Sequence, residues 1–355
     1  MRTVLLAFIA GVLLAAPGYA QEGQGGGLPN RWPAEKANAW YAGQGWLVGC
    51  NFIPSTAINQ LEMWQADTFD TETIDRELTW AAALGMNAIR VYLHDLAWET
   101  DAAGFKQRMD RFLDLATRHK IKTVFVIFDD CWDANPKAGK QPAPQPGVHN
   151  SGWLQSPGRA AVNDPAAWPR LERYVKDIIG TFGQDQRILF WDLYNEPGNS
   201  GQGAKSLPLL KKSFEWARAT PPAQPVTAAL YSNNKELDAF PYAASDIITF
   251  HNYNNAKDLS DQIARLKTSG RPVLCSEWLR RGCSDIATHL PIFKKEQVAC
   301  FHWGLVYGKT QTIYPWGSKG GEPEPKLWFH DLLRKDGSPF DPKEAALFKE
   351  LTGAK

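Results

Sequence analysis

The sequence lacks a charge excess of either sign and, beyond its first 20 residues, any long apolar run. Its 355 residues carry a formal net charge of +1 at pH 7, so it has no basic excess to attract nucleic acid or anionic lipid. A helix that spans a bilayer needs about 20 mostly apolar residues, and no later stretch meets that length. We therefore expect neither nucleic acid nor a membrane as a partner of the mature chain.

The sequence also lacks the short motifs of several enzyme and cofactor classes. Its five cysteines are odd in number and form no Cys-x-x-Cys pair, and its seven histidines are scattered. No HExxH, GxSxG or dinucleotide GxGxxG string occurs, which leaves zinc proteases, serine hydrolases and dehydrogenases without support. The segment Gly304 to Thr310 has three residues between its glycines, whereas a phosphate-binding loop has four. We expect no cofactor and no metal.

The N-terminus has the composition of a secretory signal peptide. Arg2 precedes an apolar run from Val4 to Ala16, and Gly18 and Ala20 are small, as a signal-peptidase site requires. A membrane anchor is the alternative, but the run is short for one. We expect a signal peptide over 1–20, a leader over 21–40, one domain over 41–355 without an internal linker, and export to the periplasm or the outside. We expect a monomer.

After the leader, strand and helix patterns alternate. The expected helices are 71–84, 104–120, 167–182, 207–219, 235–244, 259–269 and 284–296, and the expected strands are 45–52, 87–93, 123–128, 188–194, 225–230, 247–252, 272–277 and 298–305. Several strands are continuous apolar runs, as strands covered on both faces are. Eight strands with intervening helices predict a (β/α)8 TIM barrel, and an open doubly wound α/β sheet is the alternative.

Three connections that follow strands 1, 3 and 8 are too long to be simple turns. They span 54–70, 129–164 and 307–325, and each contains tryptophan. In a barrel all three lie on the face formed by the carboxyl ends of the strands, where active sites occur. Aromatic side chains around such a face favour a cleft for a ligand with apolar faces, such as a sugar ring. Alternatively, each tryptophan only pins its loop to the barrel.

Two of the expected strands end on a glutamate. Residues 188–194 are aromatic and β-branched and lead to Glu196, and Pro197 cannot continue a sheet ladder. The strand over 272–277 likewise ends on Glu277. Strands four and seven lie on opposite sides of a barrel mouth. Two facing carboxyl groups, one to donate a proton and one to attack, are what glycosidic cleavage needs.

These residues resemble a known family. Asn195-Glu196-Pro197 on strand four, with Glu277 on strand seven, is similar to the retaining glycoside hydrolases of clan A, most of all to glycoside hydrolase family 5, over residues 45 to 333. The resemblance implies a hydrolase that cleaves O-glycosidic bonds of a β-linked oligo- or polysaccharide in two displacements. Glu277 would be the nucleophile and Glu196 the acid and base.

Five more positions match the family pattern residue by residue. The resemblance implies that Arg90 supports the nucleophile, that His251 and Tyr253 form the strand-six pair, that Trp303 floors the subsite of the attacked sugar and that Asn195 binds its 2-hydroxyl. Each of three has a structural alternative: a surface ion pair for Arg90, a core polar group for His251 and packing for Trp303.

The sequence departs from the family at the end of strand three, where the common histidine is replaced by Asp129 and Asp130. Asp129 either binds a sugar hydroxyl in its place or caps the loop. Glu62 and Trp64, in the first long loop, either wall off one end of the cleft or cap and pack beneath the helix at 71–84.

Charge predicts which glutamate attacks. Glu277, beside Arg90 and Tyr253, should stay ionised, and Glu196, facing that negative charge, should keep its proton to higher pH. We expect the carboxyl groups to lie about 5 to 5.5 Å apart, as retention requires. An exported carbohydrate-binding protein, or a barrel without turnover, is the alternative function.

Overall fold

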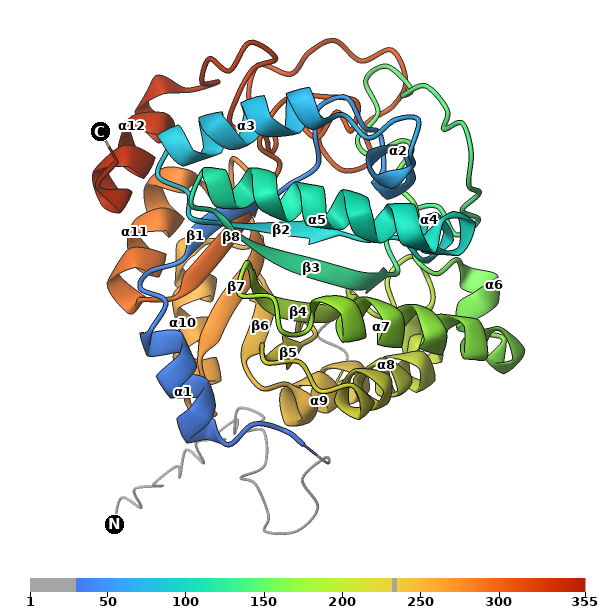
Figure 1. Ribbon diagram of the computed structural model, residues 1–355. Coiled ribbons are helices and arrows are strands. Elements are labelled where there is room, and N and C mark those ends of the chain that lie inside the picture. The colour runs from blue at the N-terminus through green and yellow to red at the C-terminus, as the bar shows by residue number, and fades with distance from the viewer. Residues whose placement is uncertain (1–29, 232–234, 355) are drawn as a thin grey trace, which may run out of the picture.

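The computed structural model describes residues 30–231 and 235–354. Eight parallel strands form one sheet in the order β5-β4-β3-β2-β1-β8-β7-β6 (Figure 1). They are β1 (Val48–Asn51), β2 (Ala88–Tyr92), β3 (Lys122–Asp129), β4 (Ile188–Asn195), β5 (Val226–Thr227), β6 (Ile248–His251), β7 (Val273–Trp278) and β8 (Ala299–Trp303). The predicted signal peptide and residues 21–29 lie outside the described residues.

The sheet closes into a barrel, which confirms the predicted fold. The first strand, β1, pairs in parallel with the last strand, β8. Between β5 and β6 the described residues form no continuous ladder; their contacts include a bridge from Leu230 to Phe250 and a hydrogen bond of 2.9 Å between the hydroxyls of Thr227 and Thr249. Because so few residues pair there, β5 is shorter than the predicted strand over 225–230.

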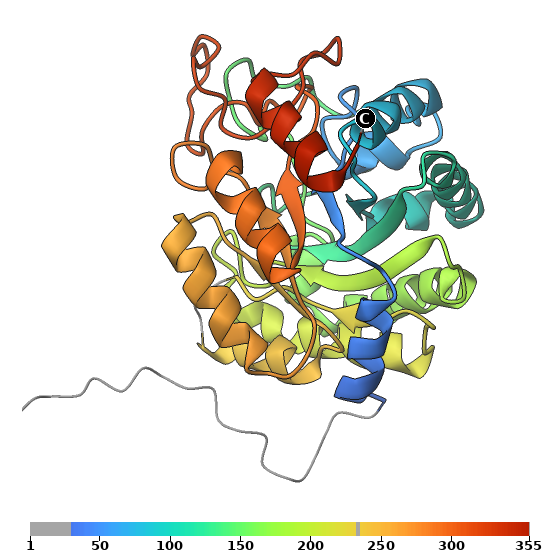
Figure 2. The same cartoon turned by 90° about the vertical axis from the view of Figure 1, so that its left-hand side faces the viewer.

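Helices cover the outside of the barrel. All seven predicted helices are present: α3 (Thr71–Ala83), α5 (Ala102–Arg118), α7 (Trp168–Phe182), α8 (Leu207–Ala219), α9 (Lys235–Ala244), α10 (Ala256–Lys267) and α11 (Ile286–Glu296). Asp101 caps the N-terminus of α5, where its side chain accepts a hydrogen bond from Gly104 N, and the apolar stripe of α5 is buried against the barrel. Shorter helices are α1 (Ala34–Ala42), α2 (Gln60–Trp64), α4 (Asp95–Thr100) and α6 (Arg159–Val162), and α12 (Pro342–Thr352) packs beside α11 (Figure 2).

The start of the described chain packs with the barrel. Most of helix α1, residues 34–40, lies within the segment assigned to the leader, yet Ala37 is fully buried and Trp32 nearly so. Both join an apolar cluster made of the first residues of several strands, and Trp32 N donates to Asp246 Oδ1 at 2.8 Å. Residues 32–37 therefore belong to the folded unit, which begins before residue 41, because they cover the end of the barrel where the strands start.

The three long loops follow β1, β3 and β8, as predicted. They contain few regular elements, chiefly α2 after β1 and α6 after β3. In the part of the chain that the structure describes, no helix combines the length and apolar character that crossing a membrane requires.

Candidate active site

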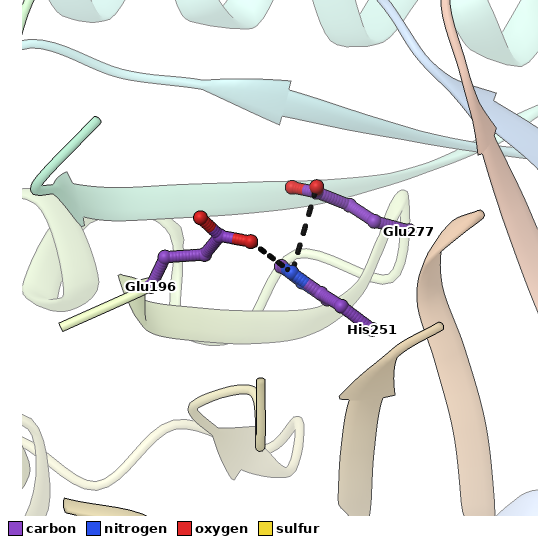
Figure 3. Close-up of side chains that lie close together, drawn as sticks. All are labelled: Glu196, His251 and Glu277. Atoms are coloured by element: carbon purple, nitrogen blue, oxygen red, sulfur yellow. Dashed lines mark hydrogen bonds and ion pairs between the residues drawn. The ribbon is translucent and has the colours of Figure 1, made fainter. Parts of the chain in front are cut away.

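The two predicted glutamates meet at the mouth of the barrel. Glu196 directly follows β4, and Glu277 lies near the end of β7, opposite His251 in the pairing with β6. Figure 3 shows His251 between the two carboxyl groups. One oxygen of each glutamate and a ring nitrogen of His251 all lie within 4.8 Å of one another. The tertiary fold thus joins three side chains from three strands.

Three hydrogen-bond donors hold Glu277, and His251 Nδ1 also lies 3.5 Å from its Oε2. Its Oε1 accepts from Arg90 Nη1 at 2.9 Å and from Tyr92 Oη at 2.7 Å, and its Oε2 accepts from Tyr253 Oη at 2.9 Å. The carboxyl side chain is only 6% exposed. A charged donor and two phenols fix both oxygens and stabilise negative charge there.

Arg90 is a buried centre of the site rather than a surface ion pair. Its guanidinium is 0% exposed and also donates to Asp192 Oδ2 at 2.8 Å, to Asn51 Oδ1 at 2.7 Å and to Asn195 Oδ1 at 2.7 Å. One cation therefore orients both Glu277 and the asparagine expected to bind the sugar 2-hydroxyl.

Glu196 has a different set of partners. His251 Nδ1 lies 2.8 Å from its Oε1, Cys131 Sγ lies 3.3 Å from its Oε2, and Asn199 Nδ2 donates to the same oxygen. Burial alone would raise the pKa of Glu196, but the hydrogen bond and charge of His251, with the other donors, bring that pKa below its usual value. The expectation that Glu196 holds its proton to higher pH is therefore wrong, because it left out these donors.

Within the described residues, Glu196, His251 and Glu277 are also the group of side chains whose oxygen and nitrogen atoms lie close enough together to bind a metal ion. Arg90 already supplies a positive charge to Glu277 at 2.9 Å, so a divalent cation there would face a buried guanidinium. The contacts described above fit a hydrogen-bonded acid and base better than a metal centre.

A cavity of about 1150 Å³ opens above these groups. Trp303 lines it, as expected, and packs edge-on against Tyr92 and Trp153 with ring centroids 5.7 and 5.6 Å away. Trp316 and Tyr253 lie on another part of the cavity wall, with their ring centroids 5.0 Å apart. Aromatic faces and carboxylates together suit a sugar ring, which has apolar faces and hydroxyl edges.

Trp64 does not reach the cavity. It is fully buried beneath the barrel mouth among Phe69, Phe105 and Phe112, and its Nε1 donates to the carbonyl oxygen of Tyr92 at 2.7 Å. The interpretation of Trp64 as a wall of the cleft is therefore wrong, and the alternative of packing holds. The large indole is better accommodated in the apolar layer between barrel and helix, where its N–H finds a backbone acceptor.

Glu62 and Asp129 also lie outside the cavity lining. Glu62 pairs with Lys309 at 2.5 Å and so ties the loop after β1 to the loop after β8. Asp129 accepts from Asn195 Nδ2 at 2.9 Å and Trp153 Nε1 at 2.7 Å, and burial raises its pKa to about 7. Asp129 therefore positions the asparagine and a tryptophan instead of replacing the family histidine as a hydroxyl acceptor. Asp130 holds the loop after β4 through the backbone N–H of Gly198 at 2.7 Å.

Sequence reasoning missed Tyr92 and Cys131. A signal for Tyr92 existed, because it stands two residues after Arg90 on β2 and side chains two apart on a strand share a face. No local signal marks Cys131, whose contact with Glu196 spans 65 residues. Only the course of the loop after β3 brings that thiol into the site.

Comparisons with known proteins agree with this geometry. The family described as cellulase (glycosyl hydrolase family 5) matches residues 49–320. No curated protein sequence matches the chain.

Solved structures share the fold at low identity. GH5_18 from Streptomyces cattleya in complex with GlcNAc has a TM-score of 0.59 and 14% identity, over 87% of this chain and 79% of that one. An exo-beta-1,4-mannosidase from Opitutaceae bacterium strain TAV5 has a TM-score of 0.60 and 16% identity, over 87% and 59%. A hyperthermostable endo-1,4-beta-D-mannanase from Thermotoga petrophila RKU-1 has 0.55 and 14%, over 86% and 99%.

The family match covers most of the chain, and the two glutamates stand at the strand ends where a glycosidase needs them. This chain therefore belongs to glycosyl hydrolase family 5 and is an O-glycosyl hydrolase.

Proposed function

We propose that the protein is a retaining hydrolase of β-linked oligo- or polysaccharides, with Glu277 as nucleophile and Glu196 as acid and base. The observation that carries this proposal is the spacing of the two carboxyl groups, which have oxygens within 4.8 Å of each other. Retaining glycosidases hold their carboxyl groups about 5 to 5.5 Å apart, and inverting ones about 6.5 to 9.5 Å apart to admit a water. This separation supports direct attack by Glu277.

In the first step an oxygen of Glu277 bonds to the anomeric carbon, and the bond from that carbon to the leaving oxygen breaks. The leaving oxygen takes a proton from the pair formed by His251 Nδ1 and Glu196 Oε1, which lie 2.8 Å apart. Because His251 and the other donors lower the pKa of Glu196, we assign this proton to the pair rather than to the carboxyl alone. The product is a glycosyl ester of Glu277 and a free aglycone hydroxyl.

In the second step water attacks the anomeric carbon and the ester bond breaks. Glu196 accepts the proton of the water, and Glu277 regains its negative charge beside Arg90. Two inversions leave the configuration unchanged. On the basis of the predicted signal peptide alone, we propose that this reaction takes place outside the cytoplasm.

We expect Glu196→Ala to separate substrates by their leaving group. A 2,4-dinitrophenyl β-glycoside needs no proton and should keep its glycosylation rate within about tenfold, whereas a methyl β-glycoside should lose about 10² to 10⁴-fold, the usual contribution of general acid catalysis. The substrates tested with each leaving group should include β-mannosides, since two of the structural neighbours are named as a β-1,4-mannosidase and a β-1,4-mannanase.

Sodium azide and proton NMR complete that experiment. Azide should rescue the variant and give the β-glycosyl azide, because it attacks the ester without a base. An α-azide would point to inversion, and binding of oligosaccharides without turnover by the wild type would favour the carbohydrate-binding alternative.

Cys131→Ala should move the alkaline limb of the kcat/KM profile to higher pH. The thiol donates to Glu196 and helps to keep its pKa low, so its removal raises that pKa and the acid keeps its proton longer. The rate at the optimum should change by no more than about tenfold, since a thiol is a weak donor and an ordinary hydrogen bond contributes about 0.5 to 1.5 kcal/mol. Cys131→Ser retains a donor and should stay close to the wild type. Equal profiles for alanine and wild type would contradict a role through Glu196.

A further inference from the structure

Among the described residues, the cavity continues on one side of the two glutamates and ends at an aromatic wall on the other. Its lining comes from β4, β6, β7 and β8, from the loops after β3 to β8 and from helices α9 and α10, with no described residue from the loop after β1. On one side it continues past Glu196 to Tyr231, Asp261 and Arg265. On the other side it stops at Trp153 and Trp303.

Two loops that are far apart in the sequence close the second side. Residues 145–150, after β3, are joined to residues 310–321, after β8, by main-chain and side-chain hydrogen bonds. These are Asn150 N to Thr310 O at 2.8 Å, Gly147 N to Gln311 Oε1 at 3.1 Å, His149 N to Ser318 Oγ at 2.9 Å and Gly321 N to Pro146 O at 2.9 Å. We call this junction the loop seam.

The loop after β1 backs the loop seam from outside. Lys309 N donates to Ser55 O at 3.0 Å, the Lys309 ammonium pairs with Glu62, and Asn59 Nδ2 donates to Gly152 O at 2.8 Å. Three loops thus brace one another over β1 and β2. Since each is held by backbone groups as well as side chains, the closure belongs to the fold of the loops and not to one movable side chain.

Almost no space is left behind the aromatic end wall. A second cavity, lined by Phe52, Ile53, Trp153 and Trp303 among others, has a volume of about 10 Å³. That is about enough for one water molecule and far too small for a sugar ring. A sugar seated against Trp303 therefore has no room for another sugar beyond it.

The chemistry of the site fixes which end of a saccharide lies there. The acid must stand next to the leaving oxygen, so the aglycone lies on the side of Glu196. The attacked sugar lies across Glu277, toward Asn195 and Trp303, with its non-reducing side against the end wall. The open side, past Glu196, receives the rest of the chain.

We propose that this hydrolase is exo-acting: it has a single glycone subsite, closed by Trp153, Trp303 and the loop seam, and it removes one sugar at a time from the non-reducing end. The proposal rests on the retaining function proposed above, which assigns the acid and the nucleophile. In this arrangement the ion pair of Glu62 with Lys309 holds the loop after β1 against the loop after β8, behind the closed end of the cavity.

The test uses the full enzyme and hexaoses labelled with 2-aminobenzamide at the reducing end. β-1,4-Mannohexaose, cellohexaose and xylohexaose are digested and sampled below about 10% conversion. We expect the first labelled product to be the pentaose, with free monosaccharide in equal amount, whichever hexaose is cut. Labelled dimers or trimers as first products would overturn the exo proposal and leave the proposed hydrolase intact. No cleavage of any hexaose or aryl β-glycoside would overturn the proposed hydrolase itself.

A variant of the end wall sharpens the test. Trp153→Ala joins the two cavities, so we expect the share of labelled tetraose, formed by release of a disaccharide, to rise severalfold. The matched control is Trp328→Ala, which removes an equally buried indole, 1% exposed, outside the cavity lining. Thermal unfolding of both variants checks that they are folded. A product pattern in Trp153→Ala identical to that of Trp328→Ala would contradict the closed glycone subsite.

Discussion

Glu277→Gln should reduce kcat by roughly 10⁴-fold or more, which corresponds to about 5.5 kcal/mol of lost transition-state stabilisation. The amide is nearly isosteric and still meets Arg90 Nη1 and the two tyrosine hydroxyls, which now lie 2.7 to 2.9 Å from Glu277. It cannot form a glycosyl ester, so the chemical step fails while the binding surface remains. Steady-state kinetics on an aryl β-glycoside, with substrate affinity measured by calorimetry, separate these two quantities.

The control for that loss is a carboxylate outside the cavity lining. Glu296 forms a surface ion pair with Lys267 at 2.6 Å, and Glu296→Gln should retain kcat within about tenfold, because a surface ion pair contributes little. After incubation with a 2-fluoro glycoside, mass spectrometry should show the mass of one bound sugar on the wild type and none on Glu277→Gln. Turnover undiminished in Glu277→Gln would end its assignment as nucleophile.

Arg90→Met should destabilise the fold by about 3 to 5 kcal/mol, the usual cost of removing one partner of a buried ion pair. The guanidinium is 0% exposed, and its loss leaves Asp192, also 0% exposed, and Glu277 without their cation. Burial already raises the pKa of Asp192 despite the charge of Arg90. Urea unfolding at pH 7 measures the loss, and the loss should shrink at acid pH as the unpaired carboxyl groups take up protons.

The reference for Arg90 is a cation on the surface of α7. Lys176 pairs with Glu172 four residues earlier, and both side chains are 39% exposed. Lys176→Ala should change the free energy of unfolding by about 0.5 kcal/mol or less. Activity should fall in Arg90→Met even where the variant is fully folded, because the same guanidinium orients Glu277 and Asn195. A stability loss no larger than that of Lys176→Ala would contradict the role of Arg90 as the buried centre of the site.

The sequence by itself determined the barrel and its two glutamates. Strands and helices are local patterns, and the predicted alternation of eight apolar runs with amphipathic segments is present in the fold, with shorter strands at β1, β5 and β8. Glu196 and Glu277 were found because each stands where a strand ends, and the ends of parallel strands meet at one face whatever the details of packing. Asn195, His251, Tyr253 and Trp303 came from the resemblance to the family, matched residue by residue.

Only the tertiary structure decided how these groups are partnered. The hydrogen bond from Arg90 to Glu277 spans 187 residues and that from Cys131 to Glu196 spans 65, and no local pattern encodes such pairs. The indole of Trp64 could equally have faced the cleft, and its burial depends on the volume left between barrel and helix. The lowered pKa of Glu196 and the closed end of the cavity likewise arise from side chains and loops distant in sequence, because electrostatics and loop packing act through space and not along the chain.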